Sequence, residues 1–233
     1  MNRTILIINL ILTMPSLIQA RQPFSINEYA NFAKYASAND SLKQADALPK
    51  VVFMGNSITE GWVNMRPAFF TDNSFLGRGI GGQVSHQMLL RFQADVIDLN
   101  PEVVVILAGT NDIAQNSGPV TLDQIMNNIT AMATLARGNG IKVALCSVLP
   151  AIAFPWFPDI SPAPLIVKLN EQIQQYAQSN DLIYVDYYSA MVDDEGGLRV
   201  PEHTSSDDLV HPNPTGYKVM EEILLKSLKP LLE

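Results

Sequence analysis

Two short segments at opposite ends of the chain carry side chains that could together perform acyl transfer. The apolar run 51–54 stops at Gly55, and Ser57 follows it closely. Near the other end, Asp208 precedes His211 by three positions, a spacing at which one turn can hold both side chains on the same side of the backbone. A serine hydroxyl is a weak nucleophile until a base takes its proton, and a carboxylate can orient that base. The residues therefore predict a serine hydrolase with Ser57 as nucleophile, His211 as base and Asp208 as orienting carboxylate.

Acyl transfer also needs hydrogen-bond donors for the oxyanion of the tetrahedral intermediate, and two loops offer them. One is the glycine-rich segment 79–83, where a backbone N–H can approach substrate without a Cβ in the way. The other is 109–112, which contains the side-chain amide of Asn111. The N–H of Ser57 could be a third donor. Each residue alone also has a structural explanation, because serine often caps helices and Asn-Asp pairs often form turns.

The elements that must position these groups alternate along the chain. Short apolar segments rich in β-branched residues predict strands at 50–54, 75–80, 103–109, 142–149 and 183–186. Amphipathic stretches predict helices near 84–98, 121–138, 162–179 and 213–232, with one extra helix within 24–44 packed outside. This alternation implies a parallel sheet with right-handed crossovers, hence a three-layer α/β sandwich. The carboxyl ends of its strands should bring the loops at 55–57, 79–83 and 109–112 to one edge.

Several helix starts carry capping signals. Ser85 is suited to cap the helix at 84–98, and Thr121 with Gln124 forms a capping-box pattern. Ser161 before a proline fits an N-cap followed by a first helical residue, and Asn213 before Pro214 opens the last helix in the same way.

The first twenty residues differ in kind from the rest. Arg3 precedes an apolar stretch over 5–14, and the segment ends on the small residue Ala20, which predicts a secretory signal peptide over 1–20. The alternative is a membrane anchor, but the apolar run is short for a bilayer span. Residues 21–233 are then expected to form a single domain in a periplasmic or extracellular protein with no stable membrane insertion.

Net charge limits the possible partners, and the cysteine and histidine content limits disulfides and metal sites. The formal net charge is −8, and removing Arg3 with the leader makes it −9. Such a charge argues against nucleic acid and anionic membrane surfaces, which both need a positive field. Cys146 is the only cysteine, so no disulfide can form within the chain, and its apolar surroundings predict a buried core thiol. The three histidines lack zinc-type spacing, so neither a metal nor another cofactor is expected.

With these segments in view, the chain resembles the SGNH hydrolases of the GDSL esterase and lipase superfamily. The family's four blocks stand in order at Gly55-Asn56-Ser57, 79–82, 109–112 and 208–211. The resemblance implies a flavodoxin-like sandwich with a five-stranded parallel sheet, the triad Ser57, His211 and Asp208, and an oxyanion hole made by Ser57 N–H, Gly82 N–H and the Asn111 side chain. The family's Asp before the active serine is Asn56 here, a position that the resemblance makes structural. Asp207 also lies near His211, but its spacing does not match the family pattern.

Aromatic residues near the expected site suggest the substrate. The loop 150–164 leaves a strand end and carries Trp156 and Phe157, and Trp62 follows the nucleophile. Aromatic faces stack on sugar rings, so these three are candidate substrate-binding residues of a carbohydrate O-acetylesterase acting on a small-molecule or glycan ester. Trp156 and Phe157 could equally be packing residues of that loop. Lysophospholipids, platelet-activating-factor-like esters and thioesters are alternative substrates, and a non-catalytic glycan-binding protein is the alternative of another class. The oligomeric state is left open.

Overall fold

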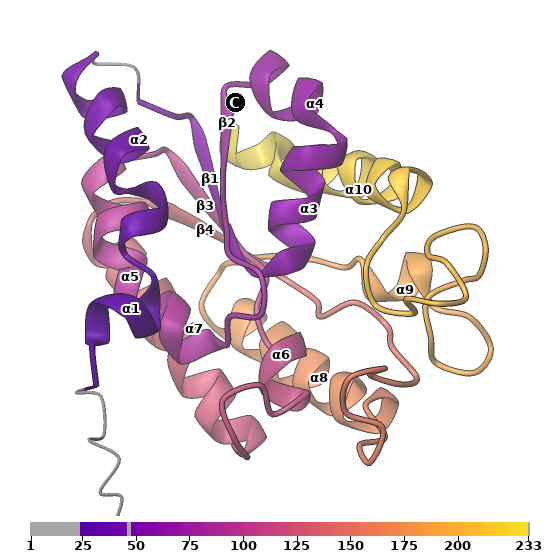
Figure 1. The fold of residues 1–233 in the computed structure, drawn as a ribbon. Helices are drawn as coiled ribbons and strands as arrows, with labels where there is room; N and C mark the ends of the chain where they lie inside the picture. Colours follow the sequence, from indigo (N-terminus) through magenta and orange to yellow (C-terminus); the bar gives the residue numbers. More distant parts are fainter. Residues whose placement is uncertain (1–23, 46–47, 233) are drawn as a thin grey trace, which may run out of the picture.

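A five-stranded parallel sheet forms the centre of the molecule (Figure 1). The computed structural model describes residues 24–45 and 48–232. The strand order is β2-β1-β3-β4-β5, with the bounds β1 Val51–Gly55, β2 Phe75–Gly79, β3 Val103–Ile106, β4 Lys142–Cys146 and β5 Ile183–Val185. Each strand lies within a few residues of its predicted position. The flavodoxin-like three-layer sandwich is confirmed.

Helices cover both faces of this sheet, as Figure 1 shows. Alternate residues of β1 point to opposite faces, because successive side chains of a strand do so. Val52 and Met54 join the core under α5 (Ser85–Asp95), α7 (Leu122–Gly138) and α8 (Ala163–Ser179). Val51 and Phe53 join the core under α3 (Ser57–Met65), α4 (Pro67–Asp72) and α10 (Pro214–Leu232). Short helices α6 (Thr110–Ile113), α9 (Tyr188–Met191) and η1 (Ile97–Leu99) complete the connections.

The predicted helix within 24–44 is two helices, α1 (Ile26–Ala30) and α2 (Ala33–Gln44). They separate at Asn31, which caps α1 in the left-handed region with a φ of 53°. Both helices pack outside the sandwich against α5. The helices α3 and α4 between β1 and β2 were missing from the predicted pattern.

The capping predictions had mixed outcomes. The capping box of Thr121 and Gln124 is confirmed, and Asn213 Oδ1 accepts the N–H groups of the first turn of α10. The N-cap of α5 is Val84 rather than Ser85, whose hydroxyl bonds to Asp112 instead. The N-cap of α8 is Pro162 rather than Ser161, so that helix begins one residue later than expected.

The strand order creates one place where loops diverge. From β1 the chain crosses to β2 on one side, and from β2 it returns past β1 to β3 on the other. Ligands in open parallel sheets bind outside the carboxyl ends of the strands at such a switch point. In Figure 1 this edge lies near the centre, where β1 passes into α3. Three predicted loops therefore meet here.

Within the described residues, no helix is both long enough and apolar enough to cross a membrane. The predicted signal peptide over 1–20 lies outside the residues that the structure describes.

Candidate active site

Ser57, His211 and Asp208 form one chain of hydrogen bonds. Ser57 is the first residue of α3, directly after β1, and its Oγ lies 2.8 Å from Nε2 of His211. Nδ1 of His211 lies 2.8 Å from Oδ1 and 3.1 Å from Oδ2 of Asp208. An ionised carboxylate can only accept, so Nδ1 carries the imidazole proton and Nε2 is left to accept from the serine hydroxyl. The arrangement can therefore remove a proton from Ser57.

A tight turn holds the histidine and its carboxylate together. Asp208 Oδ1 also accepts the backbone N–H groups of Val210, at 3.1 Å, and His211, at 2.8 Å. Thr204 Oγ1 donates to the carbonyl of His211 at 2.8 Å, which fixes the backbone on the other side. The imidazole is thus oriented before any substrate binds. Asp207, the competing carboxylate, is fully exposed, and a hydrogen bond from Ser205 lowers its pKa.

The turn from β1 into α3 explains the residues before the nucleophile. Asn56 is 1% exposed and is the N-cap of α3, where its Oδ1 accepts the N–H of Ile58 at 3.0 Å. A neutral amide can make this bond as well as a carboxylate can, so Asn56 keeps the structural role that the resemblance implied. A Cβ on Gly55 would lie 2.0 Å from Thr59 Oγ1, so only glycine fits at the strand end.

The three predicted oxyanion donors are the N–H groups of Ser57 and Gly82 and the side-chain amide of Asn111. Gly82 has a φ of 75° and space for a Cβ, so its backbone conformation rather than crowding requires glycine. A Cβ on the preceding Gly81 would lie 3.8 Å from that of Ser57, which places this loop against the nucleophile. Asn111 is 4% exposed and donates one amide hydrogen to the carbonyl of Gln83 at 2.9 Å, so its second hydrogen is available. Among the described residues, the N–H groups of Ser57 and Gly82 make no hydrogen bond.

Two further polar residues hold these loops, and sequence reasoning missed both. Asp112 is 2% exposed and accepts the N–H of Ser85, at 2.9 and 3.0 Å, and its hydroxyl, at 2.5 Å, which ties the Asn111 loop to α5. Burial raises the pKa of Asp112, although the Ser85 bonds oppose the shift. Asn116 donates to the Gly82 carbonyl at 3.2 Å and accepts Trp156 Nε1 at 3.0 Å. Asp112 could have been found beside Asn111, whereas Asn116 had no local signal.

The aromatic candidates separate into three environments. Trp156 is 45% exposed, stacks on Phe154, and its ring centroid lies 6.5 Å from that of His211. Phe157 is half-buried and packs against the core on the α8 side. Trp62 is 1% exposed, stacks on a phenylalanine and a tyrosine of the opposite core, and donates Nε1 to Glu221 at 3.2 Å. The prediction that Trp62 binds substrate is wrong, because its ring is enclosed by core side chains.

The buried thiol behaves as expected from the sequence. Cys146 is 1% exposed at the end of β4, and burial raises its pKa to about 12. His203 is also buried, with Nδ1 3.3 Å from the carbonyl of Met191. In the described part of the chain, no three histidine, cysteine or acidic side chains group as metal ligands would.

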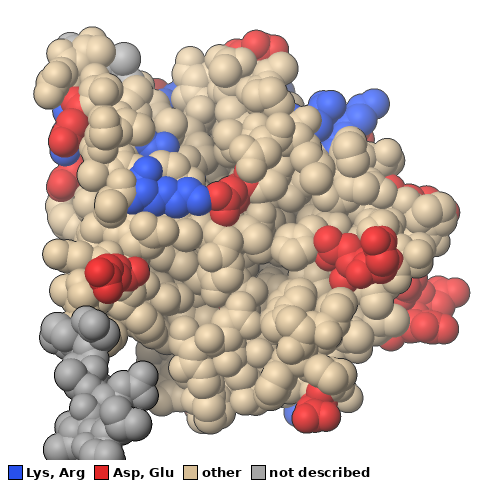
Figure 2. All heavy atoms as spheres, in the orientation of Figure 1, with Lys and Arg blue, Asp and Glu red and all other residues tan. Residues whose placement is uncertain are grey.

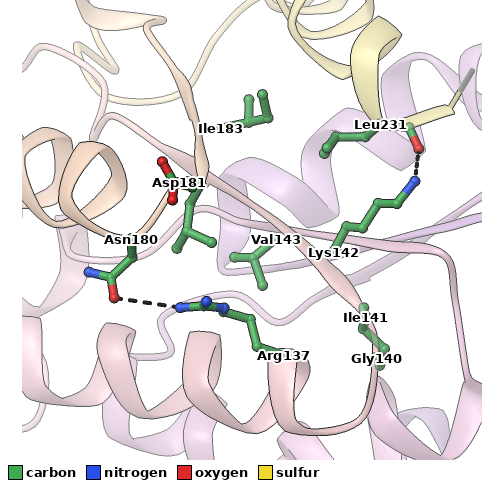
Figure 3. A pocket seen from close by; sticks show the side chains of 10 residues that line it. Arg137, Gly140, Ile141, Lys142, Val143, Asn180, Asp181, Ile183 and Leu231 are labelled. Carbon is green, nitrogen blue, oxygen red and sulfur yellow. Dashed lines mark hydrogen bonds between the residues drawn. The ribbon is translucent and has the colours of Figure 1, made fainter.

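Among the cavities lined by described residues, two lie at opposite ends of the strands. One, of about 280 Å³, adjoins Gly82 and is bordered by polar side chains that include Asn31, Gln87 and Asn116. The other, of about 340 Å³, lies at the amino ends of β4 and β5 and is drawn in Figure 3. Its two basic side chains are engaged, since Lys142 donates to the Leu231 carbonyl and Arg137 to Asn180. Because this cavity lies at the amino ends of the strands, it is remote from Ser57, which follows the carboxyl end of β1.

The fold and the bonded Ser57, His211 and Asp208 together define an α/β protein with a candidate hydrolase site. The sequence profile of the GDSL-like Lipase/Acylhydrolase family matches residues 53–219. The chain belongs to this family of ester hydrolases, as the four sequence blocks indicated.

Similar proteins come from several bacteria. The crystal structure of a candidate acylhydrolase from Bacteroides fragilis is 48% identical, with a TM-score of 0.82 over 88% of this chain and 98% of that one. An uncharacterised lipoprotein of Bacillus subtilis is 25% identical over 74% of this chain and 86% of its own length. An acetylxylan esterase of Xylanibacter ruminicola is 26% identical over 77% of this chain, which spans only 43% of that relative.

Proposed function

We propose that the protein is a serine esterase that removes acetyl groups from carbohydrates. The observation that carries the proposal is the continuous hydrogen-bonded chain from Ser57 through His211 to Asp208. The N–H groups of Ser57 and Gly82 and the amide of Asn111 are the donors that we propose for the oxyanion. Such a chain can activate a hydroxyl, and such donors can stabilise the negative charge that develops on an attacked carbonyl oxygen.

The proposed mechanism has two halves. Ser57 Oγ attacks the ester carbonyl while Nε2 of His211 takes its proton, and Asp208 stabilises the imidazolium. The oxyanion accepts hydrogen bonds from the N–H groups of Ser57 and Gly82 and from the Asn111 amide. His211 then gives the proton to the departing alcohol oxygen, which leaves an acyl-enzyme. A water molecule, deprotonated by the same histidine, attacks this ester, and return of the proton to Ser57 releases the acid.

Carbohydrate is the alcohol that the surroundings of His211 favour. Because His211 protonates the leaving oxygen, the half-exposed Trp156 beside it borders the alcohol side of the site. An indole face suits the apolar face of a sugar ring, and the polar cavity next to Gly82 suits hydroxyl groups. In Figure 2 charged groups are few around the central hollow, which fits a neutral substrate. The similarity to an acetylxylan esterase supports the same class.

The test is hydrolysis of p-nitrophenyl acetate, butyrate and octanoate by the wild-type protein and a Ser57→Ala variant, followed by acetate release from acetylated xylan. We expect turnover of acetate above the longer esters, lost in the variant. A preference for octanoate would point to the lysophospholipid or thioester alternatives. If no ester were turned over in a Ser57-dependent way, a glycan-binding protein would become the better explanation.

The same proposal extends to Trp156 and Phe157 as substrate contacts. Replacing Trp156 with alanine should raise KM for acetylated xylo-oligosaccharides about tenfold while changing KM for p-nitrophenyl acetate much less, because only the first has a sugar ring to stack. Phe157→Ala, in the same loop but at a half-buried position, tests the second proposed contact with the same two substrates. Equal changes on both substrates in the Trp156 variant would argue against a sugar platform.

We further propose that the protein is exported. The charged, apolar and small-residue segments of 1–20 support this, and a similar protein of Bacillus subtilis is a lipoprotein. Expression of the full chain in a bacterium should yield a periplasmic or secreted product whose mass corresponds to cleavage after Ala20. A product that keeps Met1 in the cytoplasm would contradict export without affecting the proposed chemistry.

A further inference from the structure

A buried arginine lies beneath the candidate site and takes no part in the proposed chemistry. Arg91, on α5, is 0% exposed. Its guanidinium makes three directed bonds: Nε donates to Gln83 Oε1 at 2.6 Å, Nη1 to Asp95 Oδ2 at 2.8 Å, and Nη2 to the Gly55 carbonyl at 3.0 Å. Two of these acceptors, Gly55 and Gln83, belong to segments that lead to the site.

The positions of those acceptors are specific. Gly55 ends β1 two residues before Ser57, and Gln83 directly follows Gly82. The planar guanidinium therefore spans from the strand that presents the nucleophile to the loop that presents an oxyanion donor. Gln83 extends the connection, because its carbonyl accepts the Asn111 amide at 2.9 Å and its side chain donates to the Ala30 carbonyl at 2.9 Å. All three proposed oxyanion donors are thus linked to one side chain.

We infer that Arg91 is a positioning residue that fixes the nucleophile and the oxyanion donors relative to one another. The inference rests on the proposed function, since it concerns the rate of that reaction. Loops tolerate small displacements without unfolding, but a reacting group displaced by about 1 Å can lose on the order of 100-fold in rate. The bonds from Arg91 to Gly55 and Gln83 restrict such displacements from within the core.

Arginine is the side chain that this task requires. Its rigid fork can hold three acceptors in fixed directions, whereas a lysine ammonium on a flexible stem cannot hold the same three at once. The arrangement is costly, because Arg78 is also buried and reaches the same carboxylate, Asp95, through Asn39. Apolar packing is often at least as stabilising as a buried ion pair, so stability alone gives little reason to keep a guanidinium there.

Arg78 offers a matched control within the same buried cluster. It is 3% exposed, and its guanidinium donates to Asn39 Oδ1 and to the Gly77 carbonyl. These bonds lie within β2 and α2 and do not reach Gly55 or Gln83. Removing Arg78 therefore deletes a buried charge of the same kind without cutting the connection between β1 and the loop of Gln83.

The experiment compares Arg91→Met, Arg91→Lys and Arg78→Met with the wild type. Thermal unfolding is followed by circular dichroism, and kcat and KM for p-nitrophenyl acetate are measured well below every midpoint, per folded molecule. We expect Arg91→Met to lower kcat about 10- to 100-fold with KM nearly unchanged, because misplaced oxyanion donors act on the transition state. Arg78→Met should lose comparable stability and stay within about twofold of wild-type kcat. The pH profile of kcat/KM should keep its shape in all three, since His211 and Asp208 are untouched.

The lysine variant separates geometry from charge. Arg91→Lys keeps a cation beside Asp95, so we expect most of the stability to return while kcat stays close to that of Arg91→Met. Full recovery of kcat would overturn the inference, because charge alone would then suffice. Equal losses of kcat in Arg91→Met and Arg78→Met would overturn it as well.

A second variant covers the case in which Arg91→Met does not fold. Gln83→Leu cuts the same connection from the loop side and leaves the ion pair of Arg91 and Asp95 in place, and it should also lower kcat more than KM rises. Wild-type activity in Gln83→Leu would overturn the inference. If the wild type itself showed no Ser57-dependent turnover, the proposed function would be wrong. That result differs from an active wild type whose kcat does not change when Arg91 is replaced, which would overturn only the inference on Arg91.

Discussion

Asp208 accepts hydrogen bonds from three N–H groups, two from the backbone and one from His211 Nδ1. Replacing it with asparagine preserves the shape of the turn, because an amide oxygen can still accept the backbone bonds. The amide would also present N–H groups to Nδ1 and favour the tautomer in which Nε2 carries the proton. That tautomer cannot accept from Ser57, so we expect kcat on p-nitrophenyl acetate to fall about 10³- to 10⁴-fold, with little change in KM.

The control for that prediction is Asp207→Asn. Asp207 is adjacent in sequence and fully exposed, and its hydrogen-bond partner is Ser205. It should stay within about twofold of the wild type. Similar losses in the two variants would mean that the turn as a whole, rather than the carboxylate at Asp208, supports the histidine.

Residue type predicted chemistry better than it predicted burial. Ser57, His211, Asp208 and Asn111 could be selected because few side chains can act as nucleophile, base or oxyanion donor, and the structure joins the first three in one chain of hydrogen bonds. Trp62 was selected only for being aromatic and close in sequence. A position five residues along a helix is turned by roughly 140°, which carries Trp62 from the sheet edge into the core.

Element positions followed from periodicity where the pattern was strong. The buried strands are continuous apolar runs, and the long helices have clear amphipathic stripes, so both were predicted to within a few residues. The helices α3 and α4 escaped because the site residues Asn56 and Ser57 begin the first, and a proline, Pro67, begins the second directly after it. This short segment therefore contains the site residues as well as the starts of two helices.

Contact between α3 and α10 depends on Glu221. Its carboxylate is 9% exposed and accepts Trp62 Nε1 at 3.2 Å and two bonds from Arg66 at 2.8 Å. Glu221→Ala leaves the buried indole N–H without a partner, so we expect about 1–3 kcal/mol less unfolding free energy, measured by urea denaturation. Glu222→Ala, the exposed neighbour on the same helix, should change it by less than about 0.5 kcal/mol. Equal effects would show that Glu221 contributes only its helix propensity.

The burial of Asp112 makes stability depend on pH. Burial raises the folded pKa of Asp112 above its ordinary value of 3.8, so the fold favours the protonated carboxyl. The stability that this group contributes is complete below pH 3.8 and is lost as the pH rises through the folded pKa. The unfolding free energy of the wild type minus that of Asp112→Asn should therefore decrease from pH 4 upward and then level off.

Urea denaturation at pH 4, 5, 6 and 7 measures that difference. Asp159→Asn, at an exposed loop position, should give a nearly constant difference over the same range. An Asp112 difference that grew with pH would mean that the Ser85 bonds outweigh burial, and the sign of the shift would be reversed.

At the scale of the whole molecule, the order of the strands was not readable from the sequence, although their parallel direction was. Alternating elements require crossovers, but only packing decides that β1 lies between β2 and β3 and so creates the switch point. Contacts such as those of Arg91 with Gly55 and Gln83 depend on that order. They could be predicted only once the fold was known.

The site is assembled from segments that only the complete sheet brings together. Ser57 and His211 are 154 positions apart, and α10 is held to α3 by the bond from Tyr217 to the Ile58 carbonyl at 2.8 Å. The 2.8 Å contact between Ser57 Oγ and His211 Nε2 therefore depends on both segments being in place. We therefore expect esterase activity and far-ultraviolet circular dichroism to be lost at the same urea concentration, as in a cooperative transition. Loss of activity at a clearly lower concentration, with the dichroism intact, would mean that the segment carrying His211 opens before the sheet, and that the site is less stable than the fold supporting it.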